Sequence, residues 1–384
     1  MRIKHTIFTI IFVLSLTFNC FTFGDENLVS NCKSAALIDF SMGKLIYEKN
    51  VHEKLEPASV TKIMTMLLAM EALESGKITL NDKVIISKNT AKMKTGTRLM
   101  LEEGETRTVE DLLYGIAVES ANDASIAIGE HISGSEEEFV KSMNSKAKKL
   151  KMNDTNFVNP HGLHAENHVT SAYDICIMSR ELLKHEKIFD YISKYMVTVY
   201  VGRKNDVKRE LVNKNKMVRF YKDVDGIKTG FTEDAGFCIS ATAKNNNLRL
   251  ISVIMGAPDT KTRNAEARKL IDYGFANYMN YSIGKKGDII GKIKINKGDS
   301  DFVNGILGTN ADILLKKGEE SNVEKIIEIP GSINTPINKD QKIGRVTLKK
   351  EGNNIANFDI VCEKSIKRAN FLNNILRAIK YWFK

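Results

Sequence analysis

The feature that most constrains this chain is an apolar run at Ile63–Met70, in which Thr65 is the single polar residue. A helix built from such a run is buried on almost every side, so it belongs in the middle of a domain. Pro57 suits a position just ahead of a first helical turn, and Ser75-Gly76 is a stop signal. We therefore predict a buried helix that begins at Ser59.

Helical spacing places Ser59 and Lys62 side by side on the first turn of that helix. A serine hydroxyl there can give its proton to an amine, and a lysine withdrawn from water has a lowered pKa and can act as a base. The spacing alone is weak, because five Ser-x-x-Lys matches occur, at Ser30, Ser41, Ser59, Ser145 and Ser282. Only the match at Ser59 opens an apolar helix, so the context selects it.

The N-terminus has the pattern of a secretory signal peptide. Two basic residues precede an apolar stretch at residues 7–21, and Thr22-Phe23-Gly24 supplies small residues for cleavage before Asp25. We expect residues 1–24 to be removed. An uncleaved anchor stays open as an alternative, although the stretch is short for a membrane span. Cys20 lacks the small residues expected before a lipidated cysteine.

The formal charge of +10 has two explanations: a lysine-rich surface, or attraction to an anionic lipid, wall polymer or nucleic acid. We expect no nucleic-acid partner, because the catalytic region has no zinc-finger spacing, basic helix-turn-helix signal or basic-aromatic stripe. Four cysteines follow the signal segment, and their scatter favours free, buried thiols, with one disulfide pair left open: Cys32, Cys176, Cys238 and Cys362.

Residues 25–280 read as one α+β domain. A hairpin is expected at residues 35–47, a largely helical region at 109–185, an antiparallel strand pair at 236–255 and a helix at 261–277. Strands at both ends of the segment with helices between them predict an antiparallel sheet with helical layers.

Two further segments follow. Residues 281–364 contain short β-rich runs separated by Gly, Asn and Pro, which predicts a small all-β domain. Residues 365–384 repeat apolar side chains, including Trp382 and Phe383, at three- and four-residue steps among cationic ones. This pattern predicts an amphipathic helix in a membrane interface. A helix docked on the protein itself or on a partner is the alternative.

Two more motifs stand between these elements. Ser120-Ala121-Asn122 lies between two predicted helices, and Lys228-Thr229-Gly230 leads into the strand that starts at Gly236. A lysine on an edge strand offers a fixed cation or a proton relay. The neighbouring hydroxyl can bind a carboxylate, and the glycine lets a ligand backbone approach.

Taken in order, Ala58–Thr65, Ser120–Ala124 and Asp225–Thr232 resemble the three signature motifs of the penicillin-recognising serine enzymes, whose catalytic domain is the β-lactamase/transpeptidase type. Together with Asn159–Leu163 and Ser171–Asp174, they are most similar to the low-molecular-mass penicillin-binding proteins that are serine D-alanyl-D-alanine carboxypeptidases. The similarity covers roughly residues 28–281. The signal segment, the β-rich domain and the terminal helix match the usual layout of that branch.

The resemblance implies an acylation and deacylation cycle that removes the terminal D-Ala from peptidoglycan stem pentapeptides and is blocked by β-lactams. Ser59 would be the nucleophile and Lys62 its general base. Ser120 would relay protons together with Lys228, and Asn122 would hold the substrate amide.

The remaining site residues implied by the resemblance bind substrate. Phe231 would share the oxyanion hole with Ser59 through backbone N–H groups, and Gly230 would let the substrate approach the strand. Thr229, Lys228 and Arg263 would bind the terminal carboxylate, although a solvent-facing arginine is the alternative for Arg263.

No metal and no cofactor are expected. His161, His164 and His168 have a spacing that could suggest zinc, but Pro160 and Gly162 break any helix there and no further ligand set is near. We interpret this segment as a loop that lines or braces the cleft.

Two other functions stay open. A serine β-lactamase shares the motifs and would need fast deacylation. Glu166 is the carboxylate in its segment that could act as the hydrolytic base. The second alternative is a wall-binding or penicillin-sensing protein without catalysis. The complete set of reactive residues argues against it. For the carboxypeptidase, the expected location is the outer face of the cytoplasmic membrane, held peripherally by the C-terminal helix.

Overall fold

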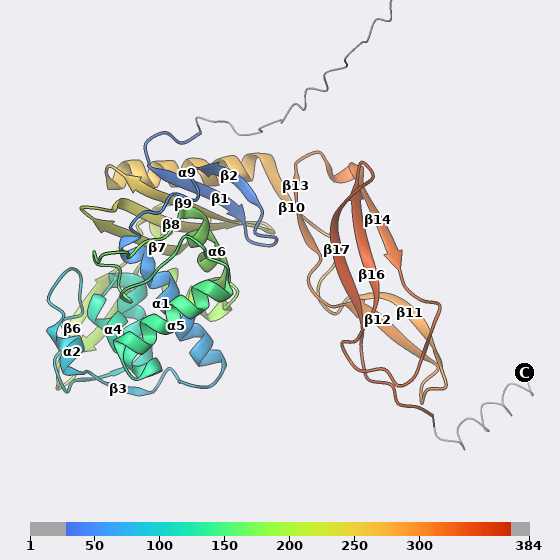
Figure 1. The fold of residues 1–384 in the computed structure, drawn as a ribbon, viewed down its shortest axis with the longest axis horizontal. Helices are drawn as coiled ribbons and strands as arrows, with labels where there is room; N and C mark the ends of the chain where they lie inside the picture. Colours follow the sequence, from blue (N-terminus) through green and yellow to red (C-terminus); the bar gives the residue numbers. More distant parts are fainter. Residues whose placement is uncertain (1–27, 370–384) are drawn as a thin grey trace, which may run out of the picture.

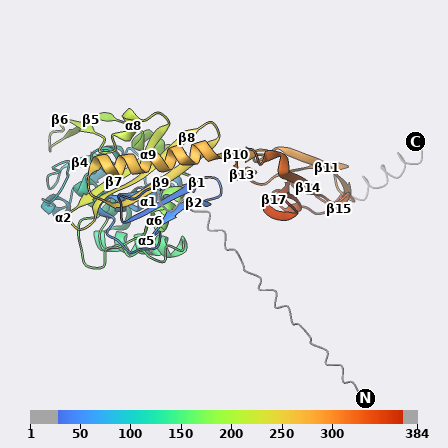
Figure 2. The same ribbon diagram turned by 90° about the horizontal axis from the view of Figure 1, so that it is seen from above.

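The computed structural model describes residues 28–369 and divides them into two domains (Figure 1). The first carries an antiparallel sheet and helices, and the second is built from strands. Figure 2 shows α9 (Thr260–Asn277) running toward β10 (Tyr278–Ser282), which crosses from the first domain to the second.

A five-stranded antiparallel sheet forms the centre of the first domain. Its order is β2-β1-β9-β8-β7, so strands from the two ends of the domain's sequence lie next to each other. The predicted hairpins, β1–β2 and β8–β9, are both confirmed. The five strands are β1 (Ser34–Asp39), β2 (Leu45–Lys49), β7 (Val224–Thr232), β8 (Gly236–Asn245) and β9 (Leu248–Ala257).

Helices cover both faces of this sheet. In Figure 1, α9 lies on one face, while α1 (Lys62–Glu74) and α6 (Ala172–Leu182) lie on the other with the remaining helical region beyond them. The predicted α+β arrangement with helical layers is therefore confirmed. The other helical elements are η1 (Ala58–Thr61), α2 (Lys88–Lys92), α3 (Val109–Tyr114), η2 (Gly115–Glu119), α4 (Asn122–Ser133), α5 (Glu136–Lys149), η3 (Glu186–Ile188), α7 (Phe189–Ile192) and α8 (Met217–Phe220).

The predicted buried helix differs from expectation at its start. Ser59 lies in η1, a 3-10 turn, and the α-helix begins at Lys62. From Lys62 to Ala72 nearly every side chain of α1 is buried, which explains the absence of charged residues from its apolar run. The helix thus forms the core of the first domain.

The second domain is all β, as predicted. It holds a two-stranded ribbon of β10 with β13 (Asp312–Lys316) and a six-stranded sheet of order β14-β16-β17-β12-β11-β15. Two small apolar cores fill it. The strands of the larger sheet are β11 (Ile289–Asn296), β12 (Phe302–Leu307), β14 (Val323–Glu328), β15 (Ser332–Asn334), β16 (Lys342–Lys350) and β17 (Asn353–Cys362), with η4 (Glu320–Asn322) before β14.

Two predictions concern the ends of the chain. The signal segment and residues 370–384 of the expected amphipathic helix lie outside the described residues. Ile366 and Arg368, at the start of that segment, are extended and bridge to Ile337 and Gly298. None of the helices within residues 28–369 combines the length and the apolar character that a membrane span requires. The four cysteines after the signal segment are free and buried.

A buried ion pair attaches a hairpin to the helical region. The hairpin pairs β5 (Met196–Val201) with β6 (Val207–Val212), and the ion pair lies beside the small ribbon of β3 (Lys83–Ile85) and β4 (Thr106–Thr108). Arg107 Nε lies 2.8 Å from Glu105 Oε1, and both side chains are almost fully buried.

Both partners of this pair hold the turn between β5 and β6. The Arg107 guanidinium donates to the carbonyls of Tyr200 and Gly202 and to Asn205 Oδ1, while Glu105 Oε1 accepts from the Gly202 N–H. The far end of β6 lines the cavity described below, so this pair helps to position that wall.

We predict that Arg107→Met lowers the free energy of unfolding of the first domain by about 3–5 kcal/mol, because it leaves the Glu105 carboxylate buried without its partner. Urea denaturation followed by circular dichroism measures the change. Arg203→Met is the matched control: Arg203 makes an exposed ion pair with Glu102, so a change within about 0.5 kcal/mol is expected. Equal effects of the two substitutions would contradict the prediction.

Candidate active site

Ser59 opens onto a cavity of about 720 Å³ at the edge of the five-stranded sheet. The cavity is bounded by η1, by the edge strand β7, by the junction of η2 and α4, by the residues that follow β6, and by the start of α9. Its lining includes Ser120, Thr229, Gly230 and Phe231, so segments from all three sequence motifs meet there.

Lys62 is the central polar group of this site. Its side chain is completely buried, and its Nζ lies 2.9 Å from Ser59 Oγ, 2.7 Å from Asn122 Oδ1 and 2.6 Å from the carbonyl oxygen of His161. Burial lowers the Lys62 pKa well below its usual value, and the nearby Lys228 lowers it further, while Asp123 acts in the opposite direction. A neutral amine at hydrogen-bond distance from a serine hydroxyl can accept its proton.

The Ser120–Asn122 segment is fixed by backbone contacts. Ser120 has a left-handed conformation (φ 68°) between η2 and α4. Asn122 donates from Nδ2 to the Thr95 carbonyl, so its Oδ1 faces Lys62. Asp123 was not predicted as a site residue, yet its buried carboxylate accepts from Leu99 N–H at 2.9 Å. The segment is therefore anchored on both sides of Asn122.

The loop at residues 159–163 supports Lys62 from the other side. Asn159 Oδ1 accepts from the Gly162 N–H at 2.6 Å, and Thr65 Oγ1 donates to the Pro160 carbonyl at 2.6 Å. Gly162 has φ +86°, and a Cβ there would lie 1.8 Å from the Ala58 carbonyl oxygen. The expectation that this loop braces the cleft is confirmed. The role of the His161 carbonyl as a partner of Lys62 carries no sequence signal of its own.

Strand β7 supplies the third motif. Lys228 is almost fully buried and donates from Nζ to the Thr229 carbonyl at 3.0 Å. Burial lowers its pKa to about 7, and the positive charges of Arg263 and Lys214 contribute. A Cβ at Gly230 would lie 2.8 Å from the Ser59 backbone nitrogen, so only glycine lets the strand pass so close to the turn that carries Ser59.

Phe231 and Arg263 line the same cavity. The Phe231 ring is about half exposed, at 48%, and its centroid lies 4.3 Å from that of Phe237. Arg263, in the first turn of α9, is only 4% exposed and donates to Asn264 Oδ1 from Nε and Nη2. Burial lowers the Arg263 pKa to about 10. The alternative of a solvent-facing arginine is thus wrong.

The end of β6 adds positive charge that the sequence did not reveal. Lys214 and Lys216 line the cavity, and Lys214 Nζ pairs with Glu119 Oε1 at 2.9 Å. With Arg263 they give the lining of the cavity an excess of cations, which suits an anionic group on a ligand. Neither lysine belongs to a motif, so only the folded hairpin brings them here.

The three histidines do not come together. His168 is buried; its Nδ1 accepts from the Val158 N–H, so Nε2 donates to Thr61 Oγ1 at 2.8 Å. Burial lowers the pKa of His161 to about 3 and that of His168 to about 4. His164 is exposed and pairs with Glu56 and Asp234. Within residues 28–369, the latter trio is the group whose ligand atoms are close enough for a metal.

Glu166, the carboxylate considered as a hydrolytic base, is exposed and does not line the cavity. Its position gives no support to fast deacylation.

The fold and the site define a class: the penicillin-recognising serine peptidases, in which a serine, two lysines and a Ser-x-Asn segment meet at the edge of an antiparallel sheet. Residues 23–259 match the family model described as D-alanyl-D-alanine carboxypeptidase. Residues 278–368 match the model of the penicillin-binding protein 5 C-terminal domain. The chain belongs to the D-alanyl-D-alanine carboxypeptidase family.

Several relatives span nearly the whole chain. The D-alanyl-D-alanine carboxypeptidase DacF of Bacillus subtilis is 44% identical over 360 residues, covering 94% of this chain and 92% of the relative. The enzyme DacD of Escherichia coli is 32% identical, covering 89% and 88%. The crystal structure of penicillin-binding protein 5 from Haemophilus influenzae superposes with a TM-score of 0.74 at 30% identity, covering 88% of this chain and 98% of that one.

We predict that the buried Lys228 makes stability depend on pH. Its folded-state pKa is about 7, while an unfolded lysine titrates near about 10.4. Between these values the unfolded chain binds more protons, so the free energy of unfolding rises with pH, by at most about 1.4 kcal/mol per unit. Lys228→Met removes this contribution, so wild type should gain stability relative to the variant from pH 7 to pH 9.

Urea denaturation at a series of pH values tests this. The control is Lys222→Met, at an exposed lysine that precedes β7, for which the difference from wild type should stay flat. A flat difference for Lys228→Met as well would refute the prediction.

Proposed function

We propose that this protein is a serine D-alanyl-D-alanine carboxypeptidase that removes the C-terminal D-Ala from peptidoglycan stem pentapeptides. The observation that carries the proposal is the Lys62 amine, fully buried and 2.9 Å from Ser59 Oγ, at the edge of a cation-lined cavity. The relatives' names and the family model point to the same substrate.

In the first step, neutral Lys62 takes the proton from Ser59 Oγ, and the oxygen attacks the carbonyl carbon of the penultimate D-Ala. The carbonyl oxygen becomes negative and is held by the backbone N–H groups of Ser59 and Phe231. The close passage of Gly230 by the Ser59 nitrogen supports this pairing. Each such donor contributes roughly 3 kcal/mol to transition-state stabilisation.

In the second step, the bond to the terminal D-Ala breaks and its nitrogen needs a proton. Ser120 lines the cavity, and Lys228 has a pKa of about 7, which suits a group that gives and regains protons near neutral pH. We assign to these two residues the relay that passes the proton taken up by Lys62 to this nitrogen, so that Lys62 is neutral again after acylation. Asn122 orients the substrate amide while its Oδ1 keeps Lys62 in place. Water then hydrolyses the acyl ester on Ser59, and no cofactor or metal takes part.

The terminal carboxylate of the substrate binds at the cationic end of the cavity. Thr229 offers its hydroxyl and Arg263, on α9, its guanidinium, and Lys228 directly precedes Thr229 on β7. Charge-assisted bonds of this kind favour a free C-terminus over an internal peptide bond. This arrangement favours removal of a terminal residue.

β-Lactams would acylate Ser59 in the same way, since their ring amide presents a carbonyl beside a carboxylate. Among similar structures, penicillin-binding protein D2 of Listeria monocytogenes is described in a cefotaxime-bound form. It superposes with a TM-score of 0.58 at 29% identity, covering 64% of this chain and 97% of that one. The exposed position of Glu166 gives a β-lactamase no matching support.

We also propose the placement of the chain. Residues 1–24 would be a signal peptide, 25–280 the peptidase domain, 281–364 the all-β domain and 365–384 a membrane-associating segment. The support is the sequence pattern at both ends and the cationic, apolar C-terminus. The enzyme would then act at the outer face of the cytoplasmic membrane.

Ser59→Ala is expected to abolish covalent labelling by a fluorescent penicillin and to lower D-Ala release from a Lys-D-Ala-D-Ala peptide by at least about 10⁴-fold, because it removes the hydroxyl that is hydrogen-bonded to the Lys62 amine. The matched control is Ser145→Ala, which removes an exposed serine of another Ser-x-x-Lys match, on α5. The control should keep full labelling. Labelling of the Ser59→Ala protein would refute the proposal.

A chain that starts at Asp25 and ends at Ala369 is expected to lose binding to anionic phosphatidylglycerol vesicles at least fivefold relative to a chain that ends at Lys384. The lost residues carry the cationic and apolar side chains. Co-sedimentation measures this, and the penicillin acylation rate of the two chains should be equal. Equal vesicle binding would contradict the membrane assignment and leave the peptidase assignment intact.

A further inference from the structure

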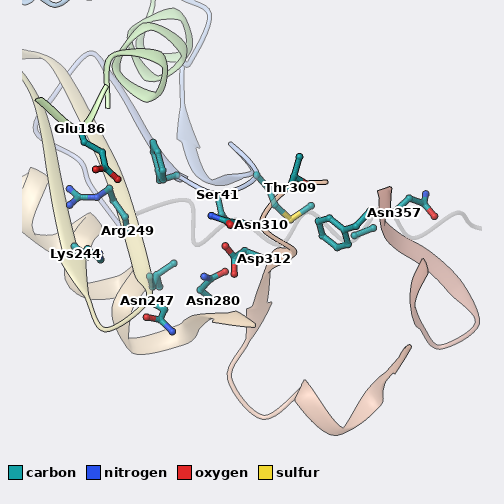
Figure 3. Close-up of a pocket in the computed structure, with 15 residues that line it drawn as sticks. Ser41, Glu186, Lys244, Asn247, Arg249, Asn280, Thr309, Asn310, Asp312 and Asn357 are labelled. Carbon is teal, nitrogen blue, oxygen red and sulfur yellow. The ribbon is translucent and has the colours of Figure 1, made fainter. Parts of the chain in front are cut away.

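A second cavity, of about 710 Å³, lies between the two domains (Figure 3). It shares no lining residue with the active-site cavity among the described residues. One wall is the turn between β1 and β2, with Ser41, and the start of β9, with Arg249. The opposite wall comes from the second domain, at Thr309–Asp312 and Ala356–Phe358, and Asn280 of β10 lies between the walls.

Hydrogen bonds fix the wall from the first domain. The Phe40 carbonyl accepts from Arg180 Nε at 2.6 Å, and the Phe40 N–H donates to the Arg249 carbonyl at 2.9 Å. Ser41 Oγ donates to Asp39 Oδ2 at 2.6 Å. A wall held in this way is formed before any ligand arrives, which lowers the entropy cost of binding.

The wall from the second domain is held similarly. Asn310 Oδ1 accepts from the Lys286 N–H at 2.9 Å, and the Ala311 N–H donates to the Gly284 carbonyl at 2.9 Å. Gly308 N–H donates to the Asp359 carbonyl at 3.0 Å. Both domains therefore present fixed surfaces, and the volume between them lies within the range of about 300–1,000 Å³ that is usual for small-ligand sites.

The side chains around this cavity carry both signs of charge. Glu186 and Asp312 contribute negative charge, and Lys244 and Arg249 contribute positive charge. Arg249 is already occupied, because its two terminal nitrogens bond both oxygens of Asp225 at 2.7 and 2.8 Å. With Arg249 neutralised by Asp225, the lining has one lysine and two carboxylates, so it disfavours an anionic ligand, in contrast to the cation-rich active-site cavity.

The remaining polar groups are mainly carboxamides, each with two donor hydrogens and one acceptor oxygen. Asn280 Oδ1 is buried and accepts no hydrogen bond from any residue in the range 28–369. In the β10–β13 register, Ser282 lies opposite Asp312, so Asn280 and Asp312 occupy diagonal positions on one face of the ribbon. The cavity also has two aromatic rings, Phe40 and Phe358. The carboxamides are those of Asn247, Asn280, Asn310 and Asn357.

We propose that this cavity binds an uncharged, N-acetylated saccharide. The carboxamide N–H groups can donate to the hydroxyl and acetamido oxygens of such a sugar, and Asn280 Oδ1 can accept from it, whereas the oxygens of Asn310 and Asn357 already accept within the protein. Phenylalanine rings match the apolar faces of pyranose rings. The site is separate from the peptidase centre and non-catalytic. It would hold the glycan part of a wall polymer while a stem peptide reaches Ser59, a consequence that rests on the proposed function, whereas saccharide binding itself does not.

Isothermal titration of the chain from Asp25 to Ala369 with the tetramer of β-1,4-linked N-acetylglucosamine tests the proposal. Saturable binding is expected. Thr309→Trp fills the cavity from an exposed lining position and should weaken binding at least fivefold, and Asn247→Ala should weaken it about threefold. Thr198→Trp, at an exposed position on β5 away from the cavity, is the matched control and should bind like wild type.

Three results would overturn the proposal: no saturable binding by wild type, undiminished binding by Thr309→Trp, or equal binding of cellotetraose, which lacks the acetamido group. Covalent labelling by fluorescent penicillin is measured on every variant. It should stay unchanged, which shows that the first domain is folded. Loss of sugar binding with intact labelling is thereby distinguished from failure of the peptidase assignment.

Discussion

The site depends on a lysine amine held in the protein core. Lys62 is fully buried, and its three hydrogen-bond partners, Ser59, Asn122 and the His161 carbonyl, come from three separate segments. None of these partners is charged, so burial disfavours the ammonium form and leaves an amine able to accept a proton. The environment that makes Lys62 a base also requires the three segments to meet. Two glycines then become necessary where the backbones pass within contact distance, at Gly162 and Gly230.

The two buried lysines of the site are electrostatically coupled. The charge of Lys228 lowers the Lys62 pKa. Burial and the charge of Arg263 in turn lower the pKa of Lys228 to about 7. In the proposed reaction, a substrate carboxylate beside Lys228 would favour its protonated form. That added positive charge would lower the Lys62 pKa, whereas the negative charge of the carboxylate would raise it, so the two effects largely cancel at Lys62. Substrate binding would therefore leave Lys62 in the basic form that its burial already favours.

The sequence predicted most of the helices and strands, but few of the contacts between segments that are far apart in the chain. The apolar run after Ser59 predicted a buried helix because periodicity reports burial directly, and the hairpins followed from short polar turns between apolar strands. The 3-10 start of that helix was missed, because Ser59 is placed by packing against β7 and not by helix propensity. Lys214 and Lys216 reach the cavity only through the β5–β6 hairpin, which the buried Arg107–Glu105 pair attaches. A contact between two segments nearly a hundred residues apart cannot be predicted from the residue pattern of either segment alone.

The two cavities differ in a way that fits one polymeric substrate. The active-site cavity carries Lys214, Lys216 and Arg263, which suit the carboxylates of a peptide, whereas the cavity between the domains has charges of both signs and carboxamides. A polymer with anionic peptides on a neutral glycan presents both kinds of surface on one molecule. Weak binding at the second cavity would raise the effective concentration of stem peptides near Ser59 without any new contact at the reacting bond. The β domain would then contribute to catalysis through the wall that it adds to this cavity, and β10, which follows α9 directly and pairs with β13, joins that wall to the first domain.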